Sequence, residues 1–184
     1  MSENPYAPPT AQVADIDSVL PDNSNPLFAV GTVKVVVMSI CTFGIYHLYW
    51  FYRNWNLIRV RDRSDIMPFW RAFFGIIWCY PLFKRFRQDG EAHGVTDGFA
   101  AGPMAVAFIL LQLAWRLPDP IWLIGFGSSV VIGFAQQYIN RINLVAAPGH
   151  ERNDSFTGWN WLGIVVGVVI FSLALIGLFY EVPE

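Results

Sequence analysis

Cysteine and histidine are the residues of this sequence that could carry redox, metal or proton-transfer chemistry, but their spacing favours none of these. Cys41 and Cys79 lie in apolar runs far apart in the chain, whereas a redox pair or zinc site needs Cys-x-x-Cys spacing or nearby histidines. His47 lies in an aromatic belt, where a lone histidine is typical of the membrane–water interface. His93 and His150 lie in polar loops without a partner pattern. We therefore interpret the cysteines as small buried thiols and predict no metal site.

The sequence also lacks the motifs of common enzyme classes. It contains no nucleophile elbow, zinc-protease, P-loop or dinucleotide-binding motif. No carboxylate lies in the middle of an apolar run, which counts against a proton-coupled transporter. Gln112, Gln136 and Gln137 are the polar residues nearest the run centres, and we expect them to bridge helices by hydrogen bonds. The sequence thus predicts no catalytic residue, no cofactor and no enzyme activity.

The feature most typical of a functional site is a basic stretch between residues 53 and 87, interleaved with Trp55, Trp70 and Trp78. Basic and aromatic residues together can indicate nucleic acid, but these flank an apolar run and the net charge is −2, so we expect no nucleic-acid partner. Attraction to anionic lipids, about 1 kcal/mol per base near the surface, explains the stretch as an orientation and anchoring signal. A defined lipid-headgroup or partner-protein surface is the alternative. Its residues are Arg53, Arg59, Arg61, Arg63, Arg71, Lys84, Arg85 and Arg87.

The composition of the whole chain places these residues beside a membrane. Of 184 residues, 54% are hydrophobic and 14% are charged, and the mean hydropathy is +0.40. A soluble domain carries about 25% charged residues, and so short a chain folded in water would expose much apolar surface. The two cysteines exclude a disulfide-stapled secreted module. The composition therefore predicts an all-α, polytopic helical membrane protein.

Five helices are predicted after a proline-rich, acidic tail over residues 1–27, which we expect to be disordered. The run at 28–52 is long enough to cross a hydrocarbon core of about 30 Å. Prolines at 118 and 120 separate two helices of a hairpin, and residues 159–180 form an uncharged final run. The expected helices cover about 28–60, 66–87, 98–117, 120–145 and 159–180 within a membrane domain at 28–184.

The run at 66–83 is the uncertain one, because Arg71 and two prolines interrupt it and basic residues flank both ends. An interfacial or re-entrant helix would keep both flanks cytoplasmic, as the positive-inside rule favours. We therefore predict four spanning helices and one interfacial or re-entrant helix, with five spanning helices as the alternative.

Placing the acidic tail outside gives a consistent arrangement across the membrane. The first helix then crosses inward, residues 53–97 and 141–158 lie inside, and the last helix exits. Ten of the 12 basic residues become cytoplasmic, with Lys34 and Arg116 toward the outside.

Small residues recur at intervals of four in the last two helices. Gly125, Ser129 and Gly133 share one helix face, and Gly163 and Gly167 share another. Small residues let membrane helices approach closely, so we expect these positions to form helix-packing surfaces. The alternative is that glycine is simply common in membrane helices.

The aromatic belt carries a family resemblance. The residues FGIYHLYWFYRNW at 43–55, PFWRAFF at 68–74 and NPYAPP at 4–9 resemble a group of small bacterial inner-membrane proteins catalogued as a domain of unknown function. The likeness covers roughly residues 1–90. It implies a multi-pass protein of the bacterial inner (cytoplasmic) membrane. It implies no catalytic or ligand-binding role for any residue.

Taken together, the sequence predicts a non-enzymatic integral membrane protein that interacts with membrane lipids, anionic ones above all, or with a protein partner or a second copy of itself. A small transporter or channel subunit acting as an oligomer is the alternative function.

Overall fold

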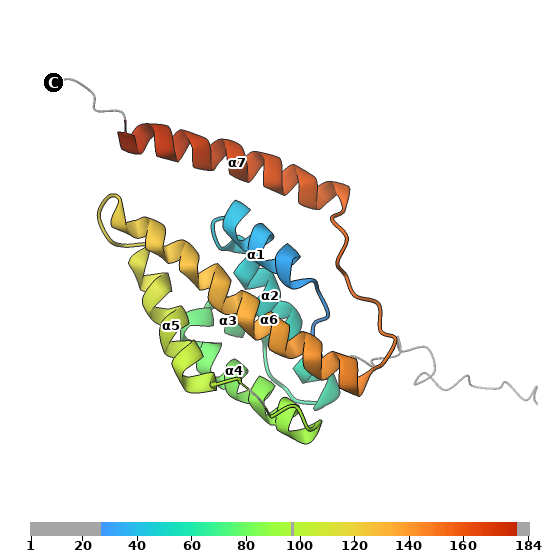
Figure 1. The fold of residues 1–184 in the computed structure, drawn as a ribbon. Coiled ribbons are helices and arrows are strands. Elements are labelled where there is room, and N and C mark those ends of the chain that lie inside the picture. The colour runs from blue at the N-terminus through green and yellow to red at the C-terminus, as the bar shows by residue number, and fades with distance from the viewer. Residues whose placement is uncertain (1–26, 97, 180–184) are drawn as a thin grey trace, which may run out of the picture.

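The structure is a computed structural model that describes residues 27–96 and 98–179, and all regular structure in these residues is helical (Figure 1). This confirms the all-α class for the described part of the chain. The tail expected over 1–27 lies outside it, apart from Leu27. The elements are α1 (Thr32–Cys41), α2 (Ile45–Arg61), α3 (Pro68–Phe73), α4 (Gly75–Ala92), α5 (Ala101–Ala114), the 3₁₀-helix η2 (Ile121–Phe126), α6 (Gly127–Ala146) and α7 (Gly158–Phe179).

The single helix expected over 28–60 is divided into a hairpin of α1 and α2. Between them, Phe43 and Gly44 have left-handed φ angles of 51° and 83°, which end α1 and reverse the chain. The backbone N–H of Phe28 donates to Asn54 Oδ1 at 3.2 Å, and the ring centroids of Phe28 and Tyr49 lie 5.8 Å apart. The middle of α2 therefore lies beside the segment that leads into α1, and the first apolar run turns back instead of continuing in one direction.

The run at 66–83 also reverses, because α3 ends at Phe73 and α4 starts two residues later. A straight helix would separate the two flanks of this run by roughly 27 Å, at about 1.5 Å per residue. Instead, Arg85 forms an ion pair with Asp62, and Arg61 Nη1 lies 3.0 Å from Asp89 Oδ2. Both flanks thus meet at one end of the molecule, which is compatible with the predicted interfacial or re-entrant helix, and whether this segment enters a membrane stays a prediction.

Helix α6 is the central element of the fold. It packs against α1, α4 and α5, and Ile132, Ala135 and Ile139 are fully buried along it. Aromatic rings from α2, α4 and α5 fill the space beside it, including Trp50, Phe83, Phe86 and Phe108. This core holds the two helical hairpins against the α5–α6 pair.

Helix α7 packs along α1 on the outside of this bundle (Figure 1). It is the one helix of the described residues that is long and apolar enough to cross a membrane, and 6% of its candidate span is buried. The apolar helices α1 and α5 are shorter. Helix length therefore indicates one candidate membrane span, and a single such helix is weak evidence of a membrane location. The four spans expected from the sequence stay a prediction.

Candidate functional site

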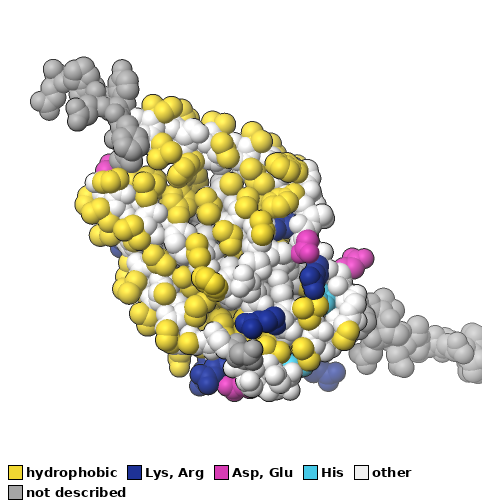
Figure 2. All heavy atoms as spheres, in the orientation of Figure 1, with side chains coloured by type: hydrophobic (Ala, Val, Ile, Leu, Met, Phe, Trp, Pro, Cys, Tyr) yellow, Lys and Arg dark blue, Asp and Glu magenta, His cyan; other side chains and the backbone are white. Residues whose placement is uncertain are grey.

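Most charged side chains of the described residues gather at one end of the molecule, which we call the basic end. It comprises the α2–α3 loop, the C-terminal halves of α2, α4 and α6, and the loop at 147–157. Figure 2 shows Lys, Arg, Asp and Glu side chains concentrated in its lower right part, with hydrophobic side chains spread over the rest of that face. Lys34 Nζ donates to Asn153 Oδ1 and to the Ser155 carbonyl, at 2.7 Å each. Lys34 thus lies at the basic end too, so the expectation that it lies toward the opposite side was wrong.

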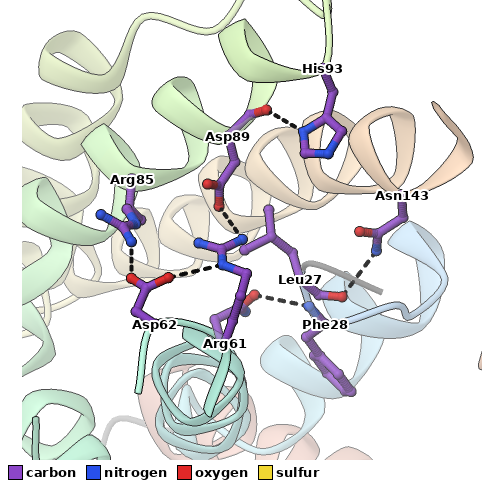
Figure 3. Close-up of polar contacts among 9 residues, drawn as sticks. Leu27, Phe28, Arg61, Asp62, Arg85, Asp89, His93 and Asn143 are labelled. Carbon is purple, nitrogen blue, oxygen red and sulfur yellow. Dashed lines mark hydrogen bonds and ion pairs between the residues drawn. The ribbon is translucent and has the colours of Figure 1, made fainter. Parts of the chain in front are cut away.

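An ion-pair network joins α2, the α2–α3 loop and α4 at this end (Figure 3). Asp62 pairs with Arg85 and, at 3.1 Å, with Arg61 Nε, while Arg61 also reaches Asp89. These contacts hold the guanidinium of Arg85 in one direction. The network therefore brings together two residues of the predicted basic surface, Arg61 and Arg85, from segments on either side of the α3–α4 reversal.

Arg71 is held by aromatic rings rather than by a carboxylate. Its guanidinium carbon lies 4.4 Å from the ring centroid of Trp55 and 4.4 Å from that of Trp78. The two rings stand nearly perpendicular, at 89°, and enclose the cation. Cation–π attraction from two tryptophans stabilises this placement. Two of the three tryptophans that interleave with arginines in the sequence, Trp55 and Trp78, thus contact one of those arginines directly.

A pocket of about 350 Å³ opens between α2, α3 and α4 beside these groups. Two buried N–H groups next to it, Trp55 Nε1 and Arg85 Nε, have no hydrogen-bond acceptor in the structure. Asp62 is the sole carboxylate among the residues that line it. These lining residues include Trp55, Asp62, Ser64, Arg71, Lys84 and Arg85.

The other basic residues predicted for this surface lie outside the pocket. Arg53 stacks 5.3 Å over the Phe28 ring. Arg59 and Arg63 line a neighbouring shallow depression on the α2–α3 loop. Arg87 Nε donates to Glu91 Oε1 at 2.8 Å, and this bond raises the pKa of Arg87. The structure therefore separates the eight predicted residues into one pocket and a surrounding basic surface.

A second polar group secures the extended segment that leads into α1. Gln136 Nε2 donates to the Phe28 carbonyl at 3.0 Å, Asn143 Nδ2 to the Leu27 carbonyl at 3.1 Å, and Asn140 Nδ2 to the Val30 carbonyl at 3.0 Å. With the Phe28–Asn54 bond drawn in Figure 3, these amides satisfy a buried stretch of non-helical backbone. We call Asn54, Gln136, Asn140 and Asn143 the amide clamp.

The glutamines expected to bridge helices behave in two ways. Gln136 Oε1 accepts from Trp50 Nε1 at 2.6 Å and so joins α6 to α2. Gln112 Nε2 lies 3.1 Å from His47 Nδ1 and joins α5 to α2. Gln137 is exposed. The three asparagines of the clamp were missed. Asn140 and Asn143 share one face of α6 with Gln136, and this spacing could have revealed those two.

His47 lies inside the bundle rather than at an interface. It is 3% exposed, and its Nε2 lies 3.4 Å from Ser129 Oγ while Nδ1 faces Gln112. Both ring nitrogens therefore have a polar neighbour suited to a neutral imidazole. Cys79 is buried and Cys41 half-buried, both as free thiols. Within the described residues, no group of three or more His, Cys, Asp or Glu could hold a metal ion.

The small residues predicted to pack helices contact other elements to different extents. A Cβ at Gly167 would overlap the backbone of Cys41, and one at Gly133 would lie 2.6 Å from Val36 Cγ2. A Cβ at Gly125, which belongs to η2, would lie 2.8 Å from the Trp115 ring. Gly163 leaves ordinary room, at 3.6 Å from Met38 Cε. Gly133 and Gly167 thus bring α6 and α7 close to α1.

No family model, curated protein or solved structure matches this chain. The resemblance to a bacterial inner-membrane family therefore stays a prediction.

Proposed function

We propose that this chain is a multi-pass protein of the bacterial inner membrane whose basic end faces the cytoplasm and binds anionic lipids, without enzyme activity. The observation that carries the proposal is the separation of a charged end from a broad apolar surface (Figure 2). Anionic lipids are enriched at cytoplasmic leaflets, which attract juxtamembrane basic residues.

The exposed apolar side chains support burial in lipid. Large hydrophobic residues are exposed on α3, α5, α6 and α7, among them Phe69 at 61%, Leu110 at 62%, Phe134 at 57% and Leu173 at 63%. Soluble monomers rarely expose contiguous apolar patches beyond a few hundred Å². Hydrocarbon around these helices would remove that surface from water.

The two hairpins suggest how the chain is arranged across the bilayer. In our proposal α5, α6 and α7 cross it, while the α1–α2 and α3–α4 hairpins enter from the basic end and return to it. Non-helical backbone is tolerated beside lipid when it is buried in protein, and Leu27, Phe28 and Val30, which lead into the first hairpin, are 0%, 5% and 1% exposed. This arrangement replaces the four spans and one elbow predicted from the sequence.

Cysteine labelling tests the arrangement. In a background with Cys41 and Cys79 replaced, single cysteines at Ser64 and Asn153 should react with a membrane-impermeant maleimide only after permeabilisation. A cysteine at Asp119, in the α5–η2 connection, should react in intact cells. Because the described chain starts at the basic end, a cysteine at Ser24 should behave like that at Ser64.

Two results would count against the proposal in different ways. External labelling at Ser64 or Asn153 would refute the orientation of the basic end. External labelling at Ser24 with protection at Ser64 would show that residues 28–60 cross the membrane, as the sequence alone predicted. Copurification from native membranes, with identification of bound lipids and proteins, tests the lipid partner against a protein partner or an oligomeric transporter.

A further inference from the structure

We infer that the pocket between α2, α3 and α4 binds a phosphate group, with a phospholipid headgroup or a free phosphate compound as the possible sources. The inference deepens the proposed function by assigning lipid recognition to one site, and it rests on that function for the lipid source. Its residues are Trp55, Arg71, Lys84 and Arg85, with Asp62 as the positioning carboxylate.

The charge balance of the pocket favours an anion. Three lining residues are cationic, Arg71, Lys84 and Arg85, and one is acidic, Asp62. Asp62 is already neutralised by Arg85 and by Arg61, which lies just outside. Arg71 and Lys84 form no ion pair within the described residues. A bound anion would supply a negative charge to pair with these two cations.

Unused hydrogen-bond donors point to the same ligand chemistry. Trp55 Nε1 and Arg85 Nε are buried without an acceptor, which costs free energy unless a partner binds. Both belong to residues that line the pocket, and each is a donor only. A phosphate group offers several acceptor oxygens and forms strong charge-assisted bonds with guanidinium groups.

The cations are oriented before any ligand arrives. The rings of Trp55 and Trp78 enclose Arg71, and the ion pair with Asp62 orients Arg85. In Figure 3, Asp62 lies between the guanidinium groups of Arg85 and Arg61. Preorganised groups lose less entropy on binding than free side chains do. This distinguishes the pocket from Arg59 and Arg63, which have no such support in the described structure.

Lys84 is the residue with which to test the site, because its side chain is exposed and its loss should not disturb the fold. The matched control is Arg87→Gln, which removes the same charge from the same helix but outside the pocket, where Arg87 pairs with Glu91. Native mass spectrometry of the full chain in a neutral detergent would measure binding of phosphatidylglycerol, with phosphatidylcholine as the zwitterionic reference. Thermal melting would verify that both variants remain folded.

We expect Lys84→Gln to weaken phosphatidylglycerol binding about fivefold, the equivalent of one base near an anionic headgroup, and Arg87→Gln to weaken it less than twofold. Displacement of the lipid by millimolar inorganic phosphate would identify free phosphate compounds as a source. Binding that phosphate does not displace would identify the lipid headgroup.

Two outcomes would overturn the inference, and they differ in what they say about the proposed function. Equal weakening by both variants would show diffuse attraction to the basic end, so the pocket would fail while the proposed function stands. Equal binding of phosphatidylglycerol and phosphatidylcholine by the unaltered chain would contradict both.

Discussion

Among the glycines of α7, Gly167 lies closest to another helix, and replacing it with alanine tests how α7 is held against α1. A Cβ at this position would overlap the carbonyl group of Cys41 and lie 2.9 Å from its Cα. These are backbone atoms inside α1, so no side-chain rotation can relieve the contact. Helix α7 must therefore move away from α1 in Gly167→Ala.

The magnitude follows from two opposing effects. Overpacking of this kind costs about 1–3 kcal/mol, while alanine stabilises a helix by about 1 kcal/mol relative to glycine. Gly163→Ala lies one turn earlier on the same helix and gains the same helix stabilisation, but its Cβ would meet only Met38 Cε, at an ordinary 3.6 Å. The difference between the two variants therefore isolates the overpacking cost, about 2 kcal/mol at its midpoint.

Thermal unfolding in detergent measures this difference. For a chain of this size, about 2 kcal/mol corresponds to roughly 4–8 °C, so Gly167→Ala should melt that far below Gly163→Ala. Equal melting temperatures for the two variants would refute the close approach of α7 and α1, because the intrinsic preference of alanine for helix is the same in both.

Two further substitutions test the amide clamp and the α1–α2 turn. Gln136→Leu should destabilise the protein by about 2–3 kcal/mol, since it leaves Trp50 Nε1 and the Phe28 carbonyl unpaired. Gln137→Leu, at an exposed position, should have little effect in the same melting assay. Similar losses of stability from both substitutions would contradict the clamp. Gly44→Ala should lower the stability by about 1–2 kcal/mol because residue 44 has a left-handed φ of 83°. Gly75→Ala is its control, because a Cβ there would lie at an ordinary 3.8 Å from the Phe51 ring. An unchanged stability in Gly44→Ala would indicate that α1 continues into α2.

The positions of the helices were predictable from the sequence to the extent that local signals determine them. The proline pair at 118 and 120 correctly separates α5 from the following helix, and the uncharged run at 159–180 corresponds closely to α7. Apolar runs and prolines act through local chain geometry, so they need no knowledge of the tertiary fold.

The break at Thr42–Gly44 was missed because hydropathy does not register it. The residues on both sides are apolar or aromatic, and a run of that length satisfies the criterion for a membrane span. The local signal was Gly44, a residue type that commonly follows a helix end in the left-handed conformation. Whether such a glycine ends a helix depends also on how the two helices pack, and the Phe28 backbone that bonds to Asn54 and Gln136 lies well before the turn in the sequence.

The candidate site, too, was predictable in its residues but not in its tertiary contacts. The sequence identified the basic residues, but Arg71, Lys84 and Arg85 meet Trp55 and Asp62 only because α3 and α4 reverse direction. No spacing rule predicts which arginine lies between two tryptophans.

The α1–α2 hairpin gathers the basic residues more completely than the sequence predicted, and the amide clamp secures the segment that leads into it. Hydropathy counted residues 28–52 as one crossing, which placed Lys34 on the opposite side from the other bases. With α1 and α2 folded as a hairpin, Lys34 meets Asn153 at the basic end, and Arg116 alone among the 12 basic residues follows a helix that leads away from it. The segment that leads into this hairpin is non-helical backbone inside the protein, where apolar surroundings offer no hydrogen bonds. Four amide side chains on α2 and α6 bind the backbone of Leu27, Phe28 and Val30, so the clamp fastens the segment before α1 to α2 and α6, and the hairpin keeps the charges together.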